Sequence, residues 1–212
     1  MAALDLQEQE QLETLKAWWK DNANWIVATL LIVAVAMGGW RGWQYYQNKQ
    51  TSEAALLYQQ FVEQLASNDA KRVNDAAAAV MDKYAATPYA SRAALIAAQV
   101  NEFGKDSLRA KSQLQWVIEH TKEDGLKSVA SLRMASLLLD EKDYAAALKL
   151  LETAHPVSFD GLYADLKGDV LNAQGKPAEA KAAYQLAYEK LDEKSAYRNL
   201  VQMKLDTFGA TK

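Results

Sequence analysis

The pattern of hydrophobic and polar positions separates a charge-free N-terminal run from a long segment with helical periodicity. From Asn22 to Trp40 the chain carries no formal charge, and most of this run is aliphatic. A helix rises about 1.5 Å per residue, so the stretch from Trp25 to Trp43 spans roughly 27 Å. This length is close to the hydrocarbon thickness of a bilayer, about 30 Å. The pattern therefore predicts one transmembrane helix at residues 22–43.

Aromatic residues flank the apolar run on both sides. Five of the six tryptophans lie between Trp18 and Trp43, and Tyr45 and Tyr46 follow directly. Tryptophan and tyrosine are enriched at membrane interfaces, because each ring has an apolar body and a polar edge. A buried core helix is the alternative interpretation of such a run, but the length and the aromatic flanks favour a membrane span.

A cleaved signal peptide is a second alternative, because Ala34-Val35-Ala36 has the small-x-small form of a cleavage site. Signal peptides begin with a short basic region. Here about twenty residues precede the apolar run, and they include acidic side chains such as Glu8, Glu10 and Glu13. We therefore expect an uncleaved anchor.

Residues 1–21 form a short segment before the predicted span. Leu12, Leu15 and Trp19 recur at helical spacing, which indicates an amphipathic helix along the membrane surface. A solvated tail is the alternative, because short helices are marginal on their own. Two basic residues flank the span closely on each side, so the positive-inside rule does not decide its orientation.

The remainder, residues 44–212, is predicted to be one helical domain. It is rich in alanine, which loses no side-chain entropy in a helix, and it has no useful run of alternating polarity. Breaks such as Gly175-Lys176-Pro177 recur every 12 to 20 residues. The expected helices are 50–67, 70–86, 88–103, 106–120, 126–141, 143–154, 159–174, 177–191 and 195–208. Short connections between them imply antiparallel hairpins.

The hairpins align as an internal repeat of small and large positions. The aligned sets are Ala98, Ala135 and Gly168; Ala110, Ala147 and Ala180; Leu114, Leu151 and Tyr184; Val117, Ala154 and Ala187; and the turns Lys105-Asp106, Lys142-Asp143 and Lys176-Pro177. Successive members of these sets are 37 and then 33 residues apart (34 for the last turn), near the 34 residues of a tetratricopeptide repeat (TPR). Small residues let two helices approach closely, and the large one fills the groove. The pattern predicts a TPR-like α-hairpin solenoid; an irregular helical bundle is the alternative.

The ends of this domain also fit a solenoid. Residues 50–86 resemble a more degenerate hairpin, and residues 195–208 resemble a capping helix with Tyr197, Leu200, Val201 and Leu205 on its apolar face. A solenoid has a concave face lined by first helices, which suits an extended peptide or a partner helix. The candidate lining residues are Arg92, Gln99, Arg133, Lys167 and Asn172.

Composition excludes several classes of function. The formal net charge is −3 and the basic residues are scattered, so nucleic acid is not expected as a partner. The chain has no cysteine, which excludes Fe–S clusters, thiolate zinc sites and thiol nucleophiles. A stripe of Ala34, Gly38 and Gly42 on one face of the span is either a helix-docking face or simply faces lipid.

Candidate catalytic groups are sparse. His120 and His155 fall on different predicted hairpins, and the clusters of acidic residues read as solvated helix ends. We therefore predict no enzyme activity, no catalytic, cofactor-binding or metal-binding residue, and no cofactor. An enzyme site assembled from His155 and scattered acids stays open as an alternative.

The order of segments resembles the YfgM family. The resemblance is carried by ETLKAWWKDN at 13–22, GWRGW at 39–43 and AALLYQ at 54–59, followed by the TPR-like region. Proteins of that family are ancillary subunits of the SecYEG translocon in the bacterial inner membrane. They have a cytoplasmic N-terminus, a single span and a periplasmic C-terminal domain.

The resemblance implies partners and a role. It implies association with SecYEG and with the membrane-anchored periplasmic chaperone PpiD, and a link from newly translocated, unfolded proteins to the folding machinery. It implies no catalytic residues. A TPR scaffold for envelope or cell-division complexes, with the same topology, is the alternative function.

Overall fold

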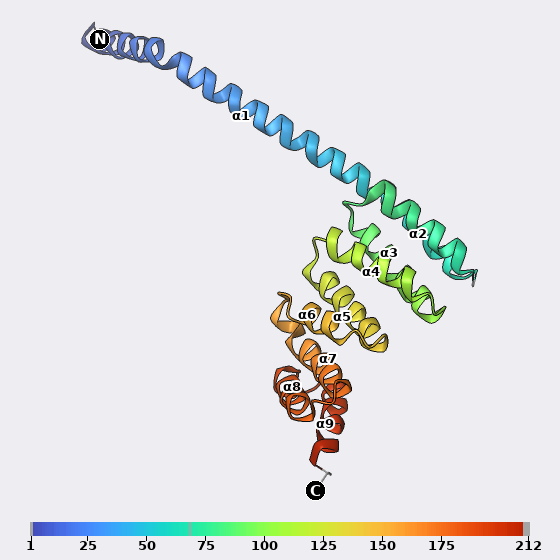
Figure 1. The fold of residues 1–212 in the computed structure, drawn as a ribbon. Coiled ribbons are helices and arrows are strands. Elements are labelled where there is room, and N and C mark those ends of the chain that lie inside the picture. Colours follow the sequence, from blue (N-terminus) through green and yellow to red (C-terminus); the bar gives the residue numbers. More distant parts are fainter. Residues whose placement is uncertain (1, 68, 210–212) are drawn as a thin grey trace. The chain divides into compact units, whose positions relative to one another are not determined.

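The computed structural model describes residues 2–67 and 69–209, and these residues form helices and no strand (Figure 1). The helices are α1 (Ala2–Leu65), α2 (Ala70–Tyr84), α3 (Pro88–Phe103), α4 (Ser107–His120), α5 (Asp124–Asp140), α6 (Tyr144–Leu151), the short 3-10 helix η1 (Val157–Phe159), α7 (Asp160–Ala173), α8 (Pro177–Lys190) and α9 (Ala196–Gly209). The all-α prediction is confirmed. The chain divides between Lys49 and Gln50 into two units, which are described separately.

Two helices, α1 and α6, differ from the sequence prediction by more than two residues. α1 is one continuous helix, where separate helices had been expected before, across and after the apolar run. α6 ends at Leu151 rather than at residue 154, and Ala154 lies exposed beyond it instead of occupying the small position of the repeat. Pro156 restricts the backbone of the residue before it, and the Thr153 hydroxyl donates to the Leu150 carbonyl oxygen at 2.7 Å. Both features favour an early end to α6.

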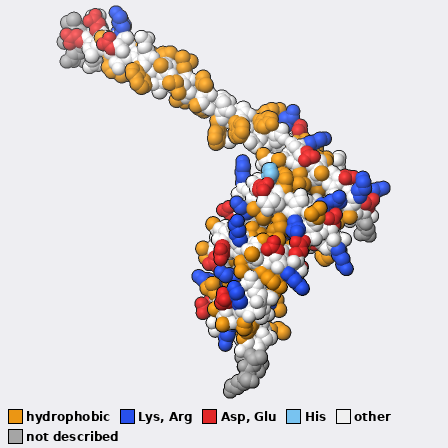
Figure 2. Space-filling model, viewed as in Figure 1, with side chains coloured by type: hydrophobic (Ala, Val, Ile, Leu, Met, Phe, Trp, Pro, Cys, Tyr) orange, Lys and Arg blue, Asp and Glu red, His pale blue; other side chains and the backbone are white. Residues whose placement is uncertain are grey.

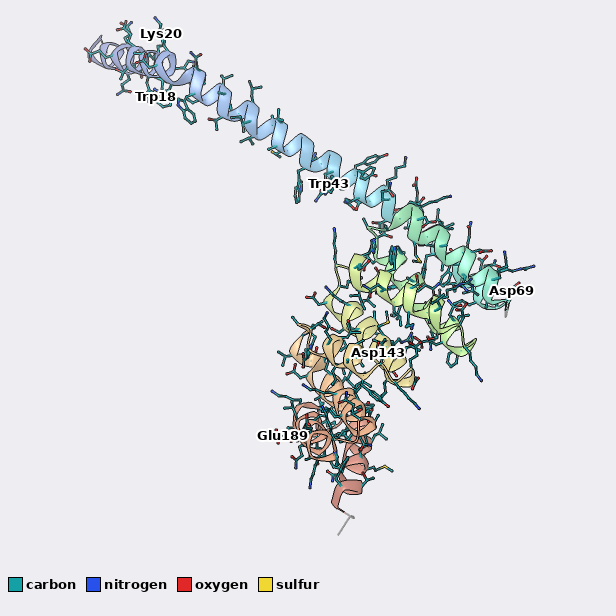
Figure 3. The ribbon with its side chains drawn as sticks, viewed as in Figure 1. Trp18, Lys20, Trp43, Asp69, Asp143 and Glu189 are labelled. Atoms are coloured by element: carbon teal, nitrogen blue, oxygen red, sulfur yellow. The ribbon has the colours of Figure 1, made fainter. Side chains whose placement is uncertain are left out.

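In the first unit, the apolar run of α1 is exposed on every side. Trp25 is 78% exposed and Ile32 is 70% exposed, and no part of the most apolar window is buried by protein. Figure 2 shows hydrophobic side chains gathered along this helix, and Figure 3 shows Trp18 and Trp43 at the two ends of the run. An exposed apolar surface of this extent marks a contact with a membrane or with another protein. α1 is long and apolar enough to cross a membrane, and a soluble core helix would have been covered.

In the second unit, the helices stack in sequence order as antiparallel hairpins. Each helix from α2 onward packs against the next one, and α5 also contacts the first helices of the two neighbouring hairpins, α3 and α7. In Figure 1 the α2–α3, α4–α5 and α6–α7 connections lie along one edge, and the α3–α4 and α5–α6 turns lie along the opposite edge. This arrangement confirms the TPR-like solenoid.

The turns inside three hairpins share one backbone geometry. Lys105, Lys142 and Gly175 all have positive φ, at 59°, 64° and 75°. The amide of the residue after each donates to a carbonyl oxygen five residues back, as in Asp106 to Asn101 at 2.9 Å. This is the Schellman ending of a helix, which satisfies carbonyl groups that the helix leaves unpaired.

The same geometry corrects the alignment of the third turn. Gly175, not Lys176, occupies the left-handed position of Lys105 and Lys142. Lys176 therefore stands at the N-cap, where the two earlier hairpins have aspartates whose carboxylates accept backbone N–H groups. Asp143 is one of these caps, and Asp69 caps α2 in the same way (Figure 3).

Small and large side chains mesh between the two helices of each hairpin. Ala98 and Leu114 are both fully buried in one cluster, and Ala135 lies with Leu151 in the next. In the third hairpin the pair is Gly168 and Tyr184, and a Cβ added to this glycine would lie 2.5 Å from the tyrosine ring. The glycine therefore makes room for the larger partner.

Buried amides join the first hairpins. Asn74 of α2, Asn101 of α3 and Gln113 of α4 are nearly fully buried and hydrogen-bond to one another at 2.7–2.9 Å. Because each group finds partners in the other two helices, the desolvation cost of the amides is offset only in this packing arrangement. The trio thus selects how α2, α3 and α4 meet.

The last helix, α9, covers the end of the stack. Val201 is fully buried, and Leu205 and Phe208 pack on the same cluster, but Leu200 is 44% exposed although it was expected on the covered face. Ionic contacts add to this packing. The Lys204 Nζ atom forms salt bridges with the buried Asp165 carboxylate at 2.9 Å and with the Asp169 carboxylate at 2.7 Å.

Two tyrosines complete this ionic cluster. Tyr184 donates to Asp169 at 2.7 Å and Tyr197 donates to Asp165 at 2.6 Å. Burial, followed by these carboxylates, raises the pKa of both phenols above the usual value. A raised tyrosine pKa contributes stability below about pH 10 that is lost as the pH rises further, so the cluster is intact at neutral pH.

We expect Gly168→Ala to destabilise the full-length protein by about 1–3 kcal/mol, because the new methyl group overlaps the Tyr184 ring. The double variant with Tyr184→Leu restores the pairing of the neighbouring hairpins and should recover part of this loss. Thermal unfolding in detergent measures both. Gly125→Ala is the control, since its Cβ meets open space; an equal loss there, or strict additivity in the double variant, would contradict the meshing.

We expect Lys204→Met to lower stability by about 3 kcal/mol, because Asp165 is then left buried beside Asp169 without a cation. Thermal unfolding of the full chain measures the loss. Lys194→Met is the matched control, because this exposed lysine forms no ion pair with a described residue. Similar melting temperatures for the two variants would show that the cluster does not hold α9.

Candidate partner-binding surfaces

The exposed apolar part of α1 is the first candidate surface. Gly38, Gly39 and Gly42 have open space around their Cα atoms, with no other side chain or backbone within 4 Å of an added Cβ. Small residues permit close helix packing in membranes. The Ala34, Gly38 and Gly42 stripe therefore stays a prediction of a docking face.

The second candidate is the loop edge of the helical unit, where the second helix of one hairpin connects to the first helix of the next. Three cavities lie along this edge. The α4–α5 cavity, of about 80 Å³, adjoins Thr87, Ser91 and His120. The other two are larger, about 330 and 320 Å³, and share residues of the α6–α7 connection.

The α5–α7 cavity, of about 330 Å³, lies between α5 and the start of α7. Its lining comprises Asp124, Lys127, Ser128, Ser131, Thr153, Ala154, His155, Pro156 and Tyr163. The α5 residues are spaced three or four apart, so they share one helix face. The Ser128 hydroxyl donates to the Asp124 carbonyl oxygen at 2.8 Å, which leaves it able to accept a hydrogen bond.

The α7–α8 cavity, of about 320 Å³, lies on the other side of the same connection. Its lining comprises Leu151, Glu152, His155, Asp160, Tyr163, Ala164, Lys167, Leu186 and Lys190. Its lysines are paired loosely, Lys167 with Glu152 at 3.8 Å and Lys190 with Asp160 at 3.9 Å. Such partly exposed pairs contribute little energy and are free to exchange partners.

A stacked ring pair is common to the two cavities. The rings of His155 and Tyr163 stack with centroids 3.7 Å apart. Nδ1 of His155 donates to the Thr153 carbonyl oxygen at 2.7 Å, and its Nε2 lies 3.4 Å from the Asp160 carboxylate. The Nδ1 hydrogen bond and the ring stack hold the imidazole in place, and the stack forms a boundary element of each cavity.

The length of α6 explains why these cavities are large. α4 has 14 residues and α6 has 8, although they are the second helices of successive hairpins. Ser91 and Ser128 stand at the same offset as Ala98 and Ala135, so the small α4–α5 cavity and the α5–α7 cavity are equivalent places. Where the second helix stops early, the space is left open.

The lining residues predicted for the concave face have varied surroundings. Arg92 forms a two-pronged ion pair with Glu123 at 2.9 and 3.0 Å, and Arg133 donates to the Leu95 carbonyl oxygen at 3.3 Å. Lys167 lines the α7–α8 cavity, whereas Gln99 and Asn172 line none of the three cavities. Their role in binding stays a prediction.

The two histidines lie at successive positions of the loop edge. His120 stacks on Trp116 and lines the α4–α5 cavity, and His155 lines the two larger cavities. In the described part of the chain, no three His, Asp or Glu side chains gather as a metal-binding group. Ser131, Tyr163 and Leu186 were not predicted as site residues, because their cavities depend on where α6 ends.

Comparison with known proteins places these features in a family. The profile of the tetratricopeptide repeat-like domain matches residues 16–210. An ancillary SecYEG translocon subunit of Neisseria gonorrhoeae is 34% identical over 97% of this chain and 99% of its own length. Its counterpart of the same name in Escherichia coli is 29% identical over 94% of this chain and 95% of its own length. Another, from Aggregatibacter actinomycetemcomitans, is 27% identical over 96% and 98%. No solved structure matches the chain.

Proposed function

This chain belongs to the tetratricopeptide repeat-like family of ancillary SecYEG translocon subunits, and on that premise we propose that it is a membrane-anchored, protein-binding subunit of the Sec translocon. The proposal is supported chiefly by the extent of the similarity, which runs from residue 16 through the apolar helix to residue 210. The similarity therefore includes the anchor as well as the repeats.

The proposed topology combines the anchor with the orientation that the family resemblance implies, because the flanking charges do not decide it. Residues 1–21 lie in the cytoplasm, residues 22–43 cross the bacterial inner membrane, and residues 44–212 form the periplasmic domain. The exposed tryptophans at both ends of the apolar run support these bounds, because they suit the two interfaces (Figure 3). This arrangement places the helical repeats on the side where translocated chains emerge.

The proposed role is to hold newly translocated, unfolded proteins close to the translocon and to pass them to the periplasmic chaperone PpiD. The loop-edge cavities support a binding role, because they offer concave surface with both polar and apolar walls. The chain acts by binding, without a cofactor and without enzymatic turnover. The strongest polar clusters hold helices together, as Lys204 does with Asp165.

We expect protease added to intact spheroplasts to degrade residues 44–212 and to leave a short membrane-bound fragment, because the proposed domain faces the periplasm. Immunoblots with antibodies against each end measure this. A cytoplasmic protein serves as the control for spheroplast integrity. Protection of the C-terminal end until the membrane is broken would contradict the topology, and an N-terminal end after residue 36 would contradict the anchor.

We expect SecYEG and PpiD to co-purify with the full-length tagged protein after crosslinking and extraction in mild detergent. An unrelated single-pass inner-membrane protein with the same tag is the control for non-specific recovery. Quantitative mass spectrometry measures the enrichment of each partner over this control. Absence of SecYEG would contradict the proposed function, and enrichment of division-site proteins in its place would favour the scaffold alternative.

A further inference from the structure

Two neighbouring cavities on the loop edge share a ring pair in their linings. The stacked His155 and Tyr163 rings line both cavities. Residues of α5 complete the lining of the α5–α7 cavity, and residues of α8 contribute to that of the α7–α8 cavity. Each volume, about 330 and 320 Å³, is large enough for one large side chain. A ligand that fills both must run past the ring pair and must be narrow where it does so.

The α5–α7 cavity presents hydrogen-bonding groups that the fold does not use. Ser131 is 3% exposed and lines this cavity, yet its hydroxyl makes no hydrogen bond with a described residue. Lys127 lines the same cavity and forms no ion pair with a described residue. Both groups can therefore hydrogen-bond to a polar ligand group without breaking a hydrogen bond or ion pair between described residues.

The α7–α8 cavity is better suited to an apolar group. Leu151 and Ala164 are nearly buried and line it, and Leu186 lines it from α8 while 47% exposed. Leu151 and Ala164 belong to hydrophobic core clusters, whereas Leu186 is packed against neither of these clusters and stays half exposed. Covering them with an apolar side chain removes apolar area from water, which is favourable at about 25 cal/mol per Å².

The charge balance narrows the class of ligand. Three lysines line the two cavities, and so do three acidic residues; these are Lys127, Lys167, Lys190, Asp124, Glu152 and Asp160. Phosphate groups and anionic lipids need an excess of cations, which this balance does not supply. Peptide groups carry both a donor and an acceptor, and they suit a lining that offers both.

We infer that the two cavities together bind an extended segment of unfolded polypeptide, with peptide groups at Ser131 and Lys127 and one large apolar side chain beside Leu186. An extended chain is narrow between its side chains, so it can pass the His155–Tyr163 stack. The inference rests on the proposed function and locates its polypeptide-binding site on the loop edge, instead of on the concave face for which Arg92 and Arg133 are predicted.

The test uses the full-length protein in lipid nanodiscs and a defined probe. The probe is fluorescein-labelled α-lactalbumin, reduced and alkylated with iodoacetamide so that it stays unfolded without added charge. The same protein with its disulfides intact is the folded control. Fluorescence anisotropy measures both affinities. We expect the unfolded form to bind at least about tenfold more tightly; equal affinities, or no binding of the unfolded form, would overturn the inference.

Two variants block the site from its rim. Ala154→Trp fills the α5–α7 cavity from an exposed loop position, and Leu186→Glu puts a charge into the α7–α8 cavity. We expect each to weaken probe binding by about tenfold or more, as for central contacts in other interfaces. The matched controls are Ala173→Trp, at the opposite edge, and Leu200→Glu, whose leucine is 44% exposed on α9.

The controls should bind the probe within about twofold of wild type, and all four variants should melt within about 2 °C of it, which excludes global unfolding as the cause. Equal weakening by sites and controls, or wild-type affinity in both site variants, would overturn the inference. Co-purification of SecYEG distinguishes a failure of this binding site from a failure of the proposed function. Normal recovery with unaltered probe binding refutes this site alone, whereas failure of the wild type to recover SecYEG refutes the proposed function.

Discussion

The helical unit depends on the close approach of two helices at one small residue in each hairpin. Where the first helix offers alanine, the second fills the groove with leucine; where it offers glycine, as at Gly168, the partner is Tyr184. The volume on one side thus dictates the volume on the other, because interiors are close-packed and leave no spare space. The Schellman turns then return the chain at the right place for this contact.

The departures from this regular stack form the proposed binding site. A repeat whose helices all had the same length would close its edges with helix ends, as the small α4–α5 cavity illustrates. α6 stops early, and the connection that follows it borders two larger cavities around the His155–Tyr163 stack. The repeated contacts between helices therefore stabilise the fold, and the two larger cavities result from one short helix, α6.

The two units place their apolar side chains in different environments. The helical unit hides small and large apolar residues between helices, and it uses buried polar groups such as the Asn74–Asn101–Gln113 trio to select one packing arrangement. The apolar run of α1 does the opposite, since it exposes large side chains all round. The helical unit is suited to water, and the apolar run of α1 is suited to lipid, as expected of a domain that is attached to a membrane.

The sequence by itself determined the apolar helix, the all-α class, most helix bounds and the meshing pairs, because these depend on hydrophobic run length and on local breaks such as Gly175. It placed the third turn one residue late and extended α6 too far. Only the tertiary structure decided the Lys204 cluster and the loop-edge cavities. The acidic partners of Lys204 lie 35 or more residues away along the chain. The linings of the two larger cavities come from four helices and a loop. Such contacts follow from packing geometry, for which a one-dimensional pattern holds no local signal.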